Sequence, residues 1–466
     1  MSWIAEAWDA LKGWVNRMFT RDEITKAIGA DIAPSEEQQK QVALWASMYR
    51  NAPEWVNNED VFSLNLSATI ASELARGASI EMALTVEGSA RAKWLQEQVQ
   101  PLVDDVRSDL EVGLALGGMI WKPIPLDGKV AINVLPADAF YPIRFDSTGE
   151  IEAAVFVDQR KVGKRTYTKL EMHDLKDGVY TVHNRAYVSD NGNNLGSPAE
   201  LNVVEDWAGL EPVATIQGTD KLLFAYFKAP GGNPNDTGSP MGVSCYARAV
   251  DLIKEADKLH SGFLWEFESG QRALYADVVA FKKNDAGDLI LPNKRLYRAL
   301  NGTSNIGEGD LFKEWTPNLR EQNYLNGLSA LYRRIELATG LAYGTLSDPD
   351  TVARTASEVI SSRQRTYSTL KDIQRNLQSA MERLVEVVDF YATAYNLSPK
   401  GAYHLTFEFD DSVLVDKNQQ MLTDRQTVNM GIMPKSIFLQ RNYGLDEATA
   451  QLWLSQMQDE SPTEVF

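Results

Sequence analysis

Histidine and cysteine, the residues that most often bind metals or act as nucleophiles, are scarce in this 466-residue chain. The two nearest of its four histidines, His173 and His183, could face each other across a hairpin turn at Asp177-Gly178. No cysteine or third histidine stands near them in the sequence, so we interpret both as hydrogen-bonded strand residues. The single cysteine, Cys245, is expected to pack as a small side chain early in a helix. The sequence therefore predicts no metal site and no cofactor.

Paired acids offer a second kind of chemistry. Asp104-Asp105 and Asp410-Asp411 could hold Mg²⁺ or act as an acid–base pair, which makes a metal-dependent hydrolase or nuclease one hypothesis. The chain has 64 acidic residues, however, and neighbouring carboxylates are common on so acidic a surface. It also lacks the phosphate-binding loop G-x-x-x-x-G-K-[ST] and the serine elbow G-x-S-x-G. We therefore expect a protein that is not an enzyme.

The charge of the chain limits its partners. A formal net charge of −18 argues against a surface that grips nucleic acid by neutralising phosphates, but it suits one past which nucleic acid moves without sticking. A single cysteine excludes an internal disulfide and indicates no oxidising compartment. Acids and a lysine interrupt the N-terminal helix of Trp3, Trp8 and Trp14, so we expect neither a signal peptide nor membrane binding there. No apolar run elsewhere is long enough to span a bilayer.

The element that organises the chain is a helix predicted over residues 355–396. Thr355 and Glu358 form a capping box at its start, and no glycine or proline follows until Pro399. Apolar residues then recur every three or four positions in one stripe, which gives a rod of about 60 Å. A rod of this length requires a long partner surface, either in the same chain or in other copies of it.

The first half of the chain predicts helices and then strands. Residues 1–115 are expected to be mostly helical, with capping boxes at Thr20 and Ser35, a short strand at 81–87 and two helices on either side of Pro101. Residues 119–228 alternate with period two and carry Asp-Gly turns, which predicts an antiparallel meander.

The second half predicts a β insert carried on two helices. The first helix is expected to begin at Ser239 and Pro240 and to end at Gly270, and the second to run from Thr316 to Gly340. Between them lies the strand-rich insert 271–315. The segment 341–354 lacks periodicity, and after the long helix we expect one strand at 403–409 and short helices from 416 onward. The predicted fold class is α+β.

The order of these elements resembles the portal, or head-to-tail connector, proteins of long-tailed bacteriophages. The pieces that carry the resemblance are K228-A-P-G-G-N233, S239-P-M-G-V-S244, A249-V-D-L-I-K-E-A-D257, T355-A-S-E-V359, G431-I-M-P-K435 and Y443-G-L-D-E-A448. The resemblance covers nearly the whole chain. It implies a ring of twelve copies around a DNA channel at one vertex of the capsid.

The resemblance also implies how the chain is divided. The wing would comprise residues 1–238, made of helices and a β meander, and the long helix with a wing strand would comprise 355–415. The remaining regions would be stem helix 1 at 239–270, the clip at 271–315, stem helix 2 at 316–340, the tunnel loop at 341–354 and the crown at 416–466.

The resemblance implies a structural protein of the virion, assembled in the host cytoplasm, that passes double-stranded DNA without reading its sequence. Its implied partners are the terminase large subunit, the major capsid or scaffolding protein, and a head-completion protein; no membrane is involved. We expect the tunnel loop and DNA channel to use Tyr343, Thr345, Ser347, Asp348, Asp350 and Arg354. The expected channel face of the stem is Glu255 and Lys258, and the expected clip docking residues are Arg272, Lys282, Lys283 and Arg295. The alternative is an intracellular helical adaptor or scaffold protein without a channel.

Overall fold

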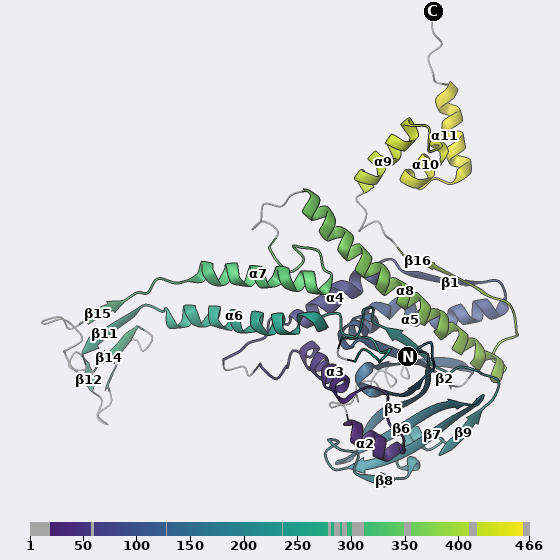
Figure 1. The fold of residues 1–466 in the computed structure, drawn as a ribbon, viewed down its shortest axis with the longest axis horizontal. Helices are drawn as coiled ribbons and strands as arrows, with labels where there is room; N and C mark the ends of the chain where they lie inside the picture. The colour runs from purple at the N-terminus through teal and green to yellow at the C-terminus, as the bar shows by residue number, and fades with distance from the viewer. Residues whose placement is uncertain are drawn as a thin grey trace, which may run out of the picture. The chain divides into compact units, whose positions relative to one another are not determined.

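The computed structural model describes residues 19–56, 60–126, 128–234, 236–277, 281–283, 289–290, 296–300, 312–348, 356–409 and 417–459. The chain forms two compact units, one of residues 1–79 and 85–405 and one of residues 80–84 and 406–466. Helices and strands are mixed throughout, which confirms the α+β class (Figure 1). Several predicted features lie outside the described residues: Trp3, Trp8, Trp14, Arg295, Asp350, Arg354, Thr355, Asp410 and Asp411.

The described N-terminal part of the chain contains four helices, in a region predicted to be mostly helical. They are α2 (Arg21–Ile28), α3 (Glu36–Tyr49), α4 (Leu66–Ser79) and α5 (Ala90–Leu116). Thr20 makes the complete capping box with Glu23. At α3 only half of the predicted box forms: Ser35 accepts from the Gln38 backbone, whereas the Gln38 side-chain amide donates to the Gly242 carbonyl, 3.5 Å away.

The expectation of two helices around Pro101 is wrong, because α5 runs unbroken through it. Pro101 faces solvent, while Val99, Leu102 and Val103 on either side of it are buried. Burial of both flanking turns therefore outweighs the roughly 3 kcal/mol that an interior proline costs a helix.

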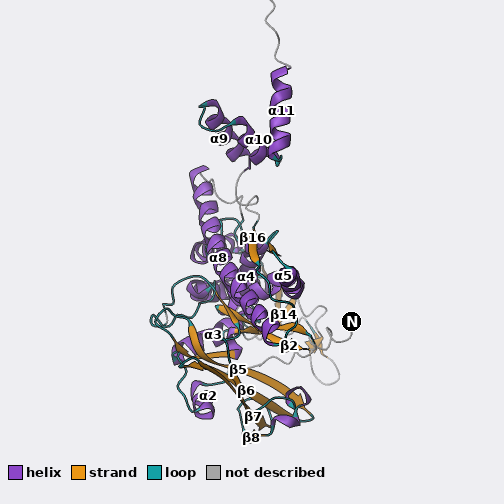
Figure 2. Cartoon of the chain, turned by 90° about the vertical axis from the view of Figure 1, so that its right-hand side faces the viewer, coloured by secondary structure: helices purple, strands orange, loops and turns teal. Residues whose placement is uncertain are grey.

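The period-two region forms two sheets rather than one meander. The first is β10 (Ala225–Lys228), β2 (Gly118–Leu126) and β3 (Lys129–Pro136), all antiparallel. The second is the predicted meander of β4 (Phe140–Phe145), β5 (Ile151–Val162), β6 (Arg165–Lys176) and β7 (Val179–Ser189), with β8 (Ser197–Ala199) and β9 (Val213–Ile216) on β7. Figure 2 shows these long strands side by side.

The predicted Asp177-Gly178 turn is confirmed, with φ of 51° and 77°, but it sets a register that separates the two histidines. His173 lies opposite Val182 and His183 opposite Met172, so the histidines point to opposite faces of the sheet. His173 is buried and hydrogen-bonded to Tyr180 and Glu171, as expected of a strand histidine.

A buried polar network crosses the meander at Glu171. One Glu171 oxygen accepts from Lys122 Nζ at 2.8 Å and the other from Lys169 Nζ at 2.9 Å. Burial alone would raise the pKa of this carboxyl, but the two ammonium groups and His173 hold it well below its usual value. The Tyr180 hydroxyl in turn accepts from the Leu223 backbone at 3.2 Å, so the network also fixes the segment that leads into β10.

The long helix is α8 (Ala356–Ala394), close to its predicted range. The predicted stripe is buried from Leu370 to Val388, where α8 packs on α4, α5, β2 and β10. Its C-terminal end is fixed by Arg91, which is 1% exposed. The guanidinium of Arg91 donates to the carbonyls of Asp389, Ser398 and Pro399 and to the Asp389 carboxylate.

The expected helix start at Ser239 is wrong. Residues 239–246 form an irregular segment, followed by a short 3-10 turn (Ala247–Ala249) and then by α6 (Val250–Ser269). The N–H of Gly242 bonds to the Tyr226 hydroxyl and that of Cys245 to the Leu114 carbonyl, so these donors are not available for a helix. Gly242 also lies against Gly117, where an added Cβ would stand 2.0 Å from the Gly117 carbonyl oxygen.

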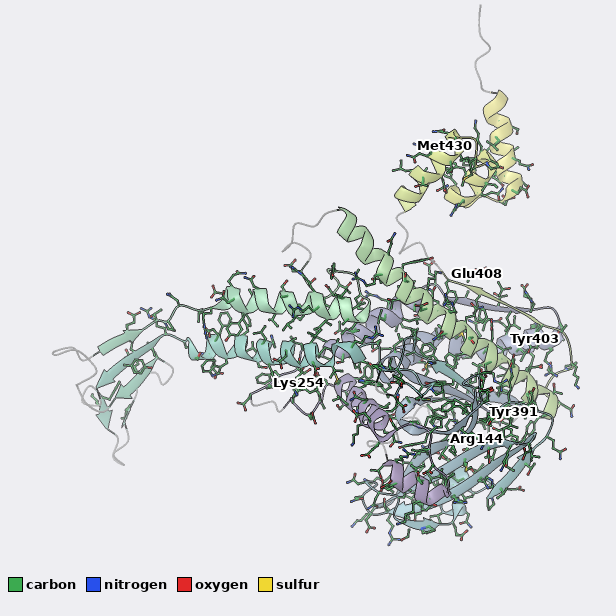
Figure 3. All side chains as sticks on the ribbon, in the orientation of Figure 1. Arg144, Lys254, Tyr391, Tyr403, Glu408 and Met430 are labelled. Carbon is green, nitrogen blue, oxygen red and sulfur yellow. The ribbon has the colours of Figure 1, made fainter. Side chains whose placement is uncertain are left out.

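The second unit contains the predicted short helices, α9 (Lys417–Asn429), α10 (Lys435–Tyr443) and α11 (Glu447–Asp459). Asp424 joins two of them, because its buried carboxylate accepts from Asn442 at 3.0 Å and pairs with Arg441. Among the described residues of these helices Ala450 is the one buried apolar residue, while Met430 (labelled in Figure 3) and Ile432 are 70% and 73% exposed. Two further strands, β1 (Ala83–Glu87) and β16 (His404–Glu408), pair with each other.

Candidate functional site

The two helices α6 and α7 (Glu321–Thr339) lie side by side and lead to and from the β insert (Figure 1). We call them the helix pair. Each helix has a glycine where the other comes closest. A Cβ on Gly327 would stand 2.9 Å from the Leu259 side chain, and one on Gly262 would stand 3.2 Å from Tyr324. The glycines therefore let the two backbones approach closely.

One side of α6 is held by the segment that precedes α4. Asp257, which is 1% exposed, accepts from the Trp55 indole at 2.9 Å and from the Leu64 backbone at 2.8 Å. Ser261, one turn later, accepts from the Phe62 backbone at 2.8 Å. Burial raises the pKa of Asp257 above its ordinary value. Lys254, labelled in Figure 3, lies over the Trp55 ring at 5.5 Å.

The other end of the pair is closed by Glu266 and Arg320. The Glu266 carboxylate accepts three hydrogen bonds, two of them from the Arg320 guanidinium and one from its backbone. This use of the Arg320 backbone explains why α7 begins at Glu321 and not, as predicted, near Thr316. This contact thus fixes the distance between the end of α6 and the start of α7, where the chain enters and leaves the β insert.

The β insert follows directly and is called the β module here. Its described strands are β11 (Ala273–Asp277), β12 (Lys282–Lys283), β13 (Leu289–Ile290), β14 (Tyr297–Leu300) and β15 (Phe312–Trp315). In the larger sheet β11 is central, parallel to β14 and antiparallel to β15. Arg272 and Glu314 form an ion pair at its base.

At its C-terminal end α7 leads into the first part of the predicted tunnel loop, residues 341–348. Glu336, which is fully buried, turns its carboxylate to this segment. One oxygen accepts from the backbone of Gly344 at 3.0 Å, Leu346 at 2.8 Å and Ser347 at 2.9 Å. The Ser347 hydroxyl lies 3.1 and 3.0 Å from the two oxygens. A single side chain thus holds most of the described loop.

The same segment also contacts α8. The Thr366 hydroxyl donates to the Gly340 carbonyl at 3.1 Å, and the Arg365 guanidinium lies over the Tyr343 ring at 5.5 Å. Gly340 has φ of 79°, and a Cβ there would meet Thr369. The loop is therefore attached to both helices that flank it in the sequence.

The structure places the predicted site residues in three different settings. Of the loop residues, Thr345 and Asp348 are exposed, Tyr343 is half-buried and Ser347 is buried against Glu336. Glu255 and Lys258 are exposed on α6 and pair with each other at 2.8 Å. In the β module Arg272 and Lys282 are exposed, while Lys283 is described by its backbone alone.

The helix pair exposes large apolar side chains along its length. Trp265 is 62% exposed and Leu337 is 52% exposed, and the others are Leu264, Phe267 and Leu325. On α7, Leu325 is 46% exposed, whereas Leu328 and Ile335 are buried. Apolar side chains exposed in this way are typical of a surface that another protein covers.

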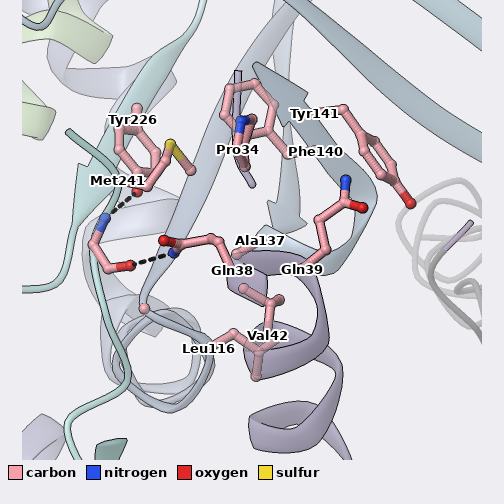
Figure 4. Close-up of a pocket in the computed structure, with 12 residues that line it drawn as sticks. Pro34, Gln38, Gln39, Val42, Leu116, Ala137, Phe140, Tyr141, Tyr226 and Met241 are labelled. Atoms are coloured by element: carbon pink, nitrogen blue, oxygen red, sulfur yellow. Dashed lines mark hydrogen bonds between the residues drawn. The ribbon is translucent and has the colours of Figure 1, made fainter. Parts of the chain in front are cut away.

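Two cavities among the described residues differ in size and openness. The one drawn in Figure 4 has a volume of about 20 Å³, room for roughly one water. It lies between α3, Phe140 and Met241, where Gly242 bonds to Gln38 and Tyr226. A more open cavity of about 290 Å³ lies between the 229–234 loop, the end of α7 and α8. In the described parts of the chain no cluster of three or more metal-binding side chains occurs, and no helix is long and apolar enough to cross a membrane.

Sequence reasoning missed Glu336 and the Glu266–Arg320 contact. Both glutamates stand on amphipathic helices among many other acids, and neither belongs to a recognisable motif. The one available signal for Glu336 is its place in the last turn of α7, where an acid is unfavourable next to the helix C-terminus.

Comparison with known families connects these elements to a protein class. The family model described as phage portal protein, SPP1 Gp6-like, matches residues 110–463, which includes the helix pair, the β module, the loop and α8. No curated protein matches the chain. Because the match covers well over half of its length, this chain belongs to the phage portal protein family.

Proposed function

We propose that this portal protein forms a closed ring of twelve copies at one capsid vertex, and that double-stranded DNA is packaged and ejected through its centre. The observation that carries the proposal is the helix pair, which has the β module at one end and the anchored loop at the other. In a ring, copies of such a pair would line the bore side by side, each presenting one patch to a different patch on its neighbour.

In this arrangement α6 and α7 are the stem, the β module is the clip, residues 341–354 are the tunnel loop, residues 1–238 with 355–415 form the wing, and residues 416–466 form the crown. The exposed apolar side chains of the pair support it, since Trp265 and Leu337 would be covered by neighbouring copies. The mutual glycine contacts keep each pair narrow enough to stand beside another.

The charges assigned to the channel support a bore that does not bind DNA tightly. Glu255 and Lys258 are assigned to the channel face, where their ion pair leaves no local excess of positive charge. Asp348 is assigned to the loop ring, with Asp350 and Arg354 further along the same loop. The net charge of −18 keeps phosphates from binding as they would to a basic lining.

The β module is assigned to docking, first of the terminase large subunit and then of a head-completion protein. Lys282 is exposed for such a contact, whereas Arg272 already pairs with Glu314 and would have to exchange partners. The wing is assigned to the major capsid or scaffolding protein. Assembly would take place in the host cytoplasm, and the finished ring is part of the virion.

Negative-stain microscopy of the purified full chain, together with light scattering, tests the proposal. We expect closed rings with a central hole and a mass of about twelve times 52.0 kDa. Single chains or dimers at every concentration, and also when the chain is co-assembled with its capsid protein, would instead favour the adaptor without a channel.

A further inference from the structure

We propose that Glu336 is the positioning residue of the tunnel loop, making residues 341–348 move as one body with α7. The proposal rests on the proposed function, because it assigns to Glu336 an effect on DNA passage that it exerts through the loop. Glu336 itself is fully buried and would touch no DNA.

The first argument is that the end of α7 does not need this carboxylate. The backbone carbonyl of Glu336 already accepts from the N–H of Gly340 and, at 2.9 Å, from that of Leu341, and a carboxylate has no proton to donate to the remaining end carbonyls of the helix. The Glu336 side chain is therefore available for the loop, and its carboxylate is hydrogen-bonded to Gly344, Leu346 and Ser347.

The second argument is electrostatic. A helix C-terminus carries partial negative charge, so a buried acid in the last turn is unfavourable unless donors surround it. The last turn of α7 holds no basic residue. Here the donors are three backbone N–H groups and one hydroxyl, all from the loop. A buried carboxyl group at this position thus keeps its hydrogen-bond partners only while the loop is folded onto it.

The third argument is mechanical. Glu266 binds Arg320 at the N-terminus of α7, and Glu336 binds the loop at its C-terminus. Gly340 is tied to α8 through Thr366. A displacement of residues 341–348 therefore has to move α7 or break buried charge-assisted hydrogen bonds, which are about twice as strong as neutral ones. The position of α7 in the ring thus sets how far this part of the loop reaches into the bore.

The test compares four full-length variants in assembled rings and in proheads. Glu336→Ala removes the shared acceptor of three backbone N–H groups, of which that of Gly344 keeps a bond to the Ser347 hydroxyl, whereas Glu336→Gln keeps one oxygen for them. Ser347→Ala removes the hydroxyl that contacts both carboxylate oxygens and that also accepts from the Gly344 N–H at 3.2 Å. Glu321→Ala is the control, since Glu321 is an exposed acid on the same helix. The readouts are ring formation, hydrogen exchange of the peptide that spans residues 341–348, and the amount of DNA packaged and retained.

We expect Glu336→Ala to form rings, to raise exchange in that peptide at least tenfold and to lower retained DNA severalfold. Glu336→Gln and Ser347→Ala should be intermediate in both measurements, and Glu321→Ala should match the unaltered protein. If Glu336→Ala does not fold, Glu336→Gln and Ser347→Ala provide the same test through their exchange rates and their retained DNA.

Unchanged hydrogen exchange in the Glu336 and Ser347 variants would show that Glu336 does not fix residues 341–348. Raised exchange with unchanged packaging would overturn its role in DNA passage. If the unaltered chain forms no rings, the proposed function fails, but the exchange result still decides whether Glu336 fixes the loop.

Discussion

The carboxylate of Glu266 holds Arg320, 54 residues later in the chain, by three hydrogen bonds. One oxygen accepts from the Arg320 backbone N–H and from Nε, each at 3.1 Å, and the other accepts from Nη2 at 2.6 Å. The Glu266 side chain is 9% exposed and that of Arg320 is 62% exposed. This contact joins the end of α6 to the start of α7 at the base of the β module. It therefore helps to hold the module on the helix pair.

Replacing Arg320 by alanine should loosen this base without unfolding the first unit. We expect hydrogen exchange to rise severalfold in peptides covering the end of α6 and the start of α7, while the core of α8 stays protected. Arg375→Ala is the matched control, because Arg375 forms an exposed ion pair with Asp372. Equal exchange in the two variants would mean that the Glu266 contact contributes nothing to the base.

The same contact should weaken in acid. The hydrogen bonds from Arg320 lower the pKa of Glu266 below its ordinary value. A depressed carboxyl pKa contributes stability above the unfolded-state pKa, near 4.5, and loses it as the pH falls through the folded-state value. Exchange at the base of the unaltered protein should therefore rise below about pH 4.5, and that of Arg320→Ala should change less.

Glu171→Gln should strongly destabilise the sheet that contains β5, β6 and β7. It removes the negative charge between Lys122 and Lys169, so the two buried ammonium groups lose the carboxylate that they share. Breaking a buried ion pair from one side costs about 3–5 kcal/mol. Glu152→Gln is the control, since Glu152 pairs with Arg144 (Figure 3) at a half-exposed site, where the loss should stay within about 1 kcal/mol. Urea unfolding measures both, and similar losses would contradict the prediction.

Asp109 should make stability depend on pH near neutrality. Burial raises its pKa to about 7, although the Trp121 indole donates to it at 3.3 Å. The folded chain then holds a proton that the unfolded chain has lost between about pH 4 and 7, so stability falls as the pH rises through this range. Asp109→Asn should stabilise the protein at pH 8 by roughly 2–4 kcal/mol and have little effect near pH 4. A gain that is independent of pH would contradict this origin.

Exposed apolar residues in the region of α9–α11 should contribute to the stability of the ring but not to the folding of the single chain. Met430→Ser with Ile432→Ser changes two side chains that are 70% and 73% exposed, so the unassembled chain should lose no more than about 0.5 kcal/mol. We expect fewer or less stable rings by sedimentation. Val162→Ser, at a 44% exposed site in the first unit, is the control. Full assembly of the double variant would show that copies do not cover this face.

The charge at the proposed channel face, Glu255 and Lys258, gives a further prediction. Glu255→Lys would place a second cation beside Lys258 in every copy, and rings should then retain DNA at low salt and release it steeply as salt rises. Glu255→Gln changes the same position without adding a cation and should bind DNA much less. The comparison is made by filter binding at several salt concentrations. Equal weak binding by both variants would place Glu255 outside the bore.

Local patterns predicted the elements well, because caps, turns and apolar periodicity act over a few residues. The Thr20 capping box, the Asp177-Gly178 turn and the long helix all follow from such signals. The errors arose where distant segments decide. Pro101 stays helical because both flanking turns are buried, and Ser239 begins no helix because Leu114 and Tyr226 accept the nearby N–H groups. Glu336 could not be found from sequence, since its partners are backbone groups of any residue type.

The contact between Gly117 and Gly242 has a consequence for sequence variation. Each glycine leaves room for the backbone of the other: a Cβ on Gly242 would lie 2.0 Å from the Gly117 carbonyl oxygen, and one on Gly117 would lie 2.9 Å from that of Gly242. Shrinking one residue cannot relieve a larger one opposite, because both are already the smallest possible. In a saturation-mutagenesis library neither position should tolerate a substitution, and no compensating second change should rescue either.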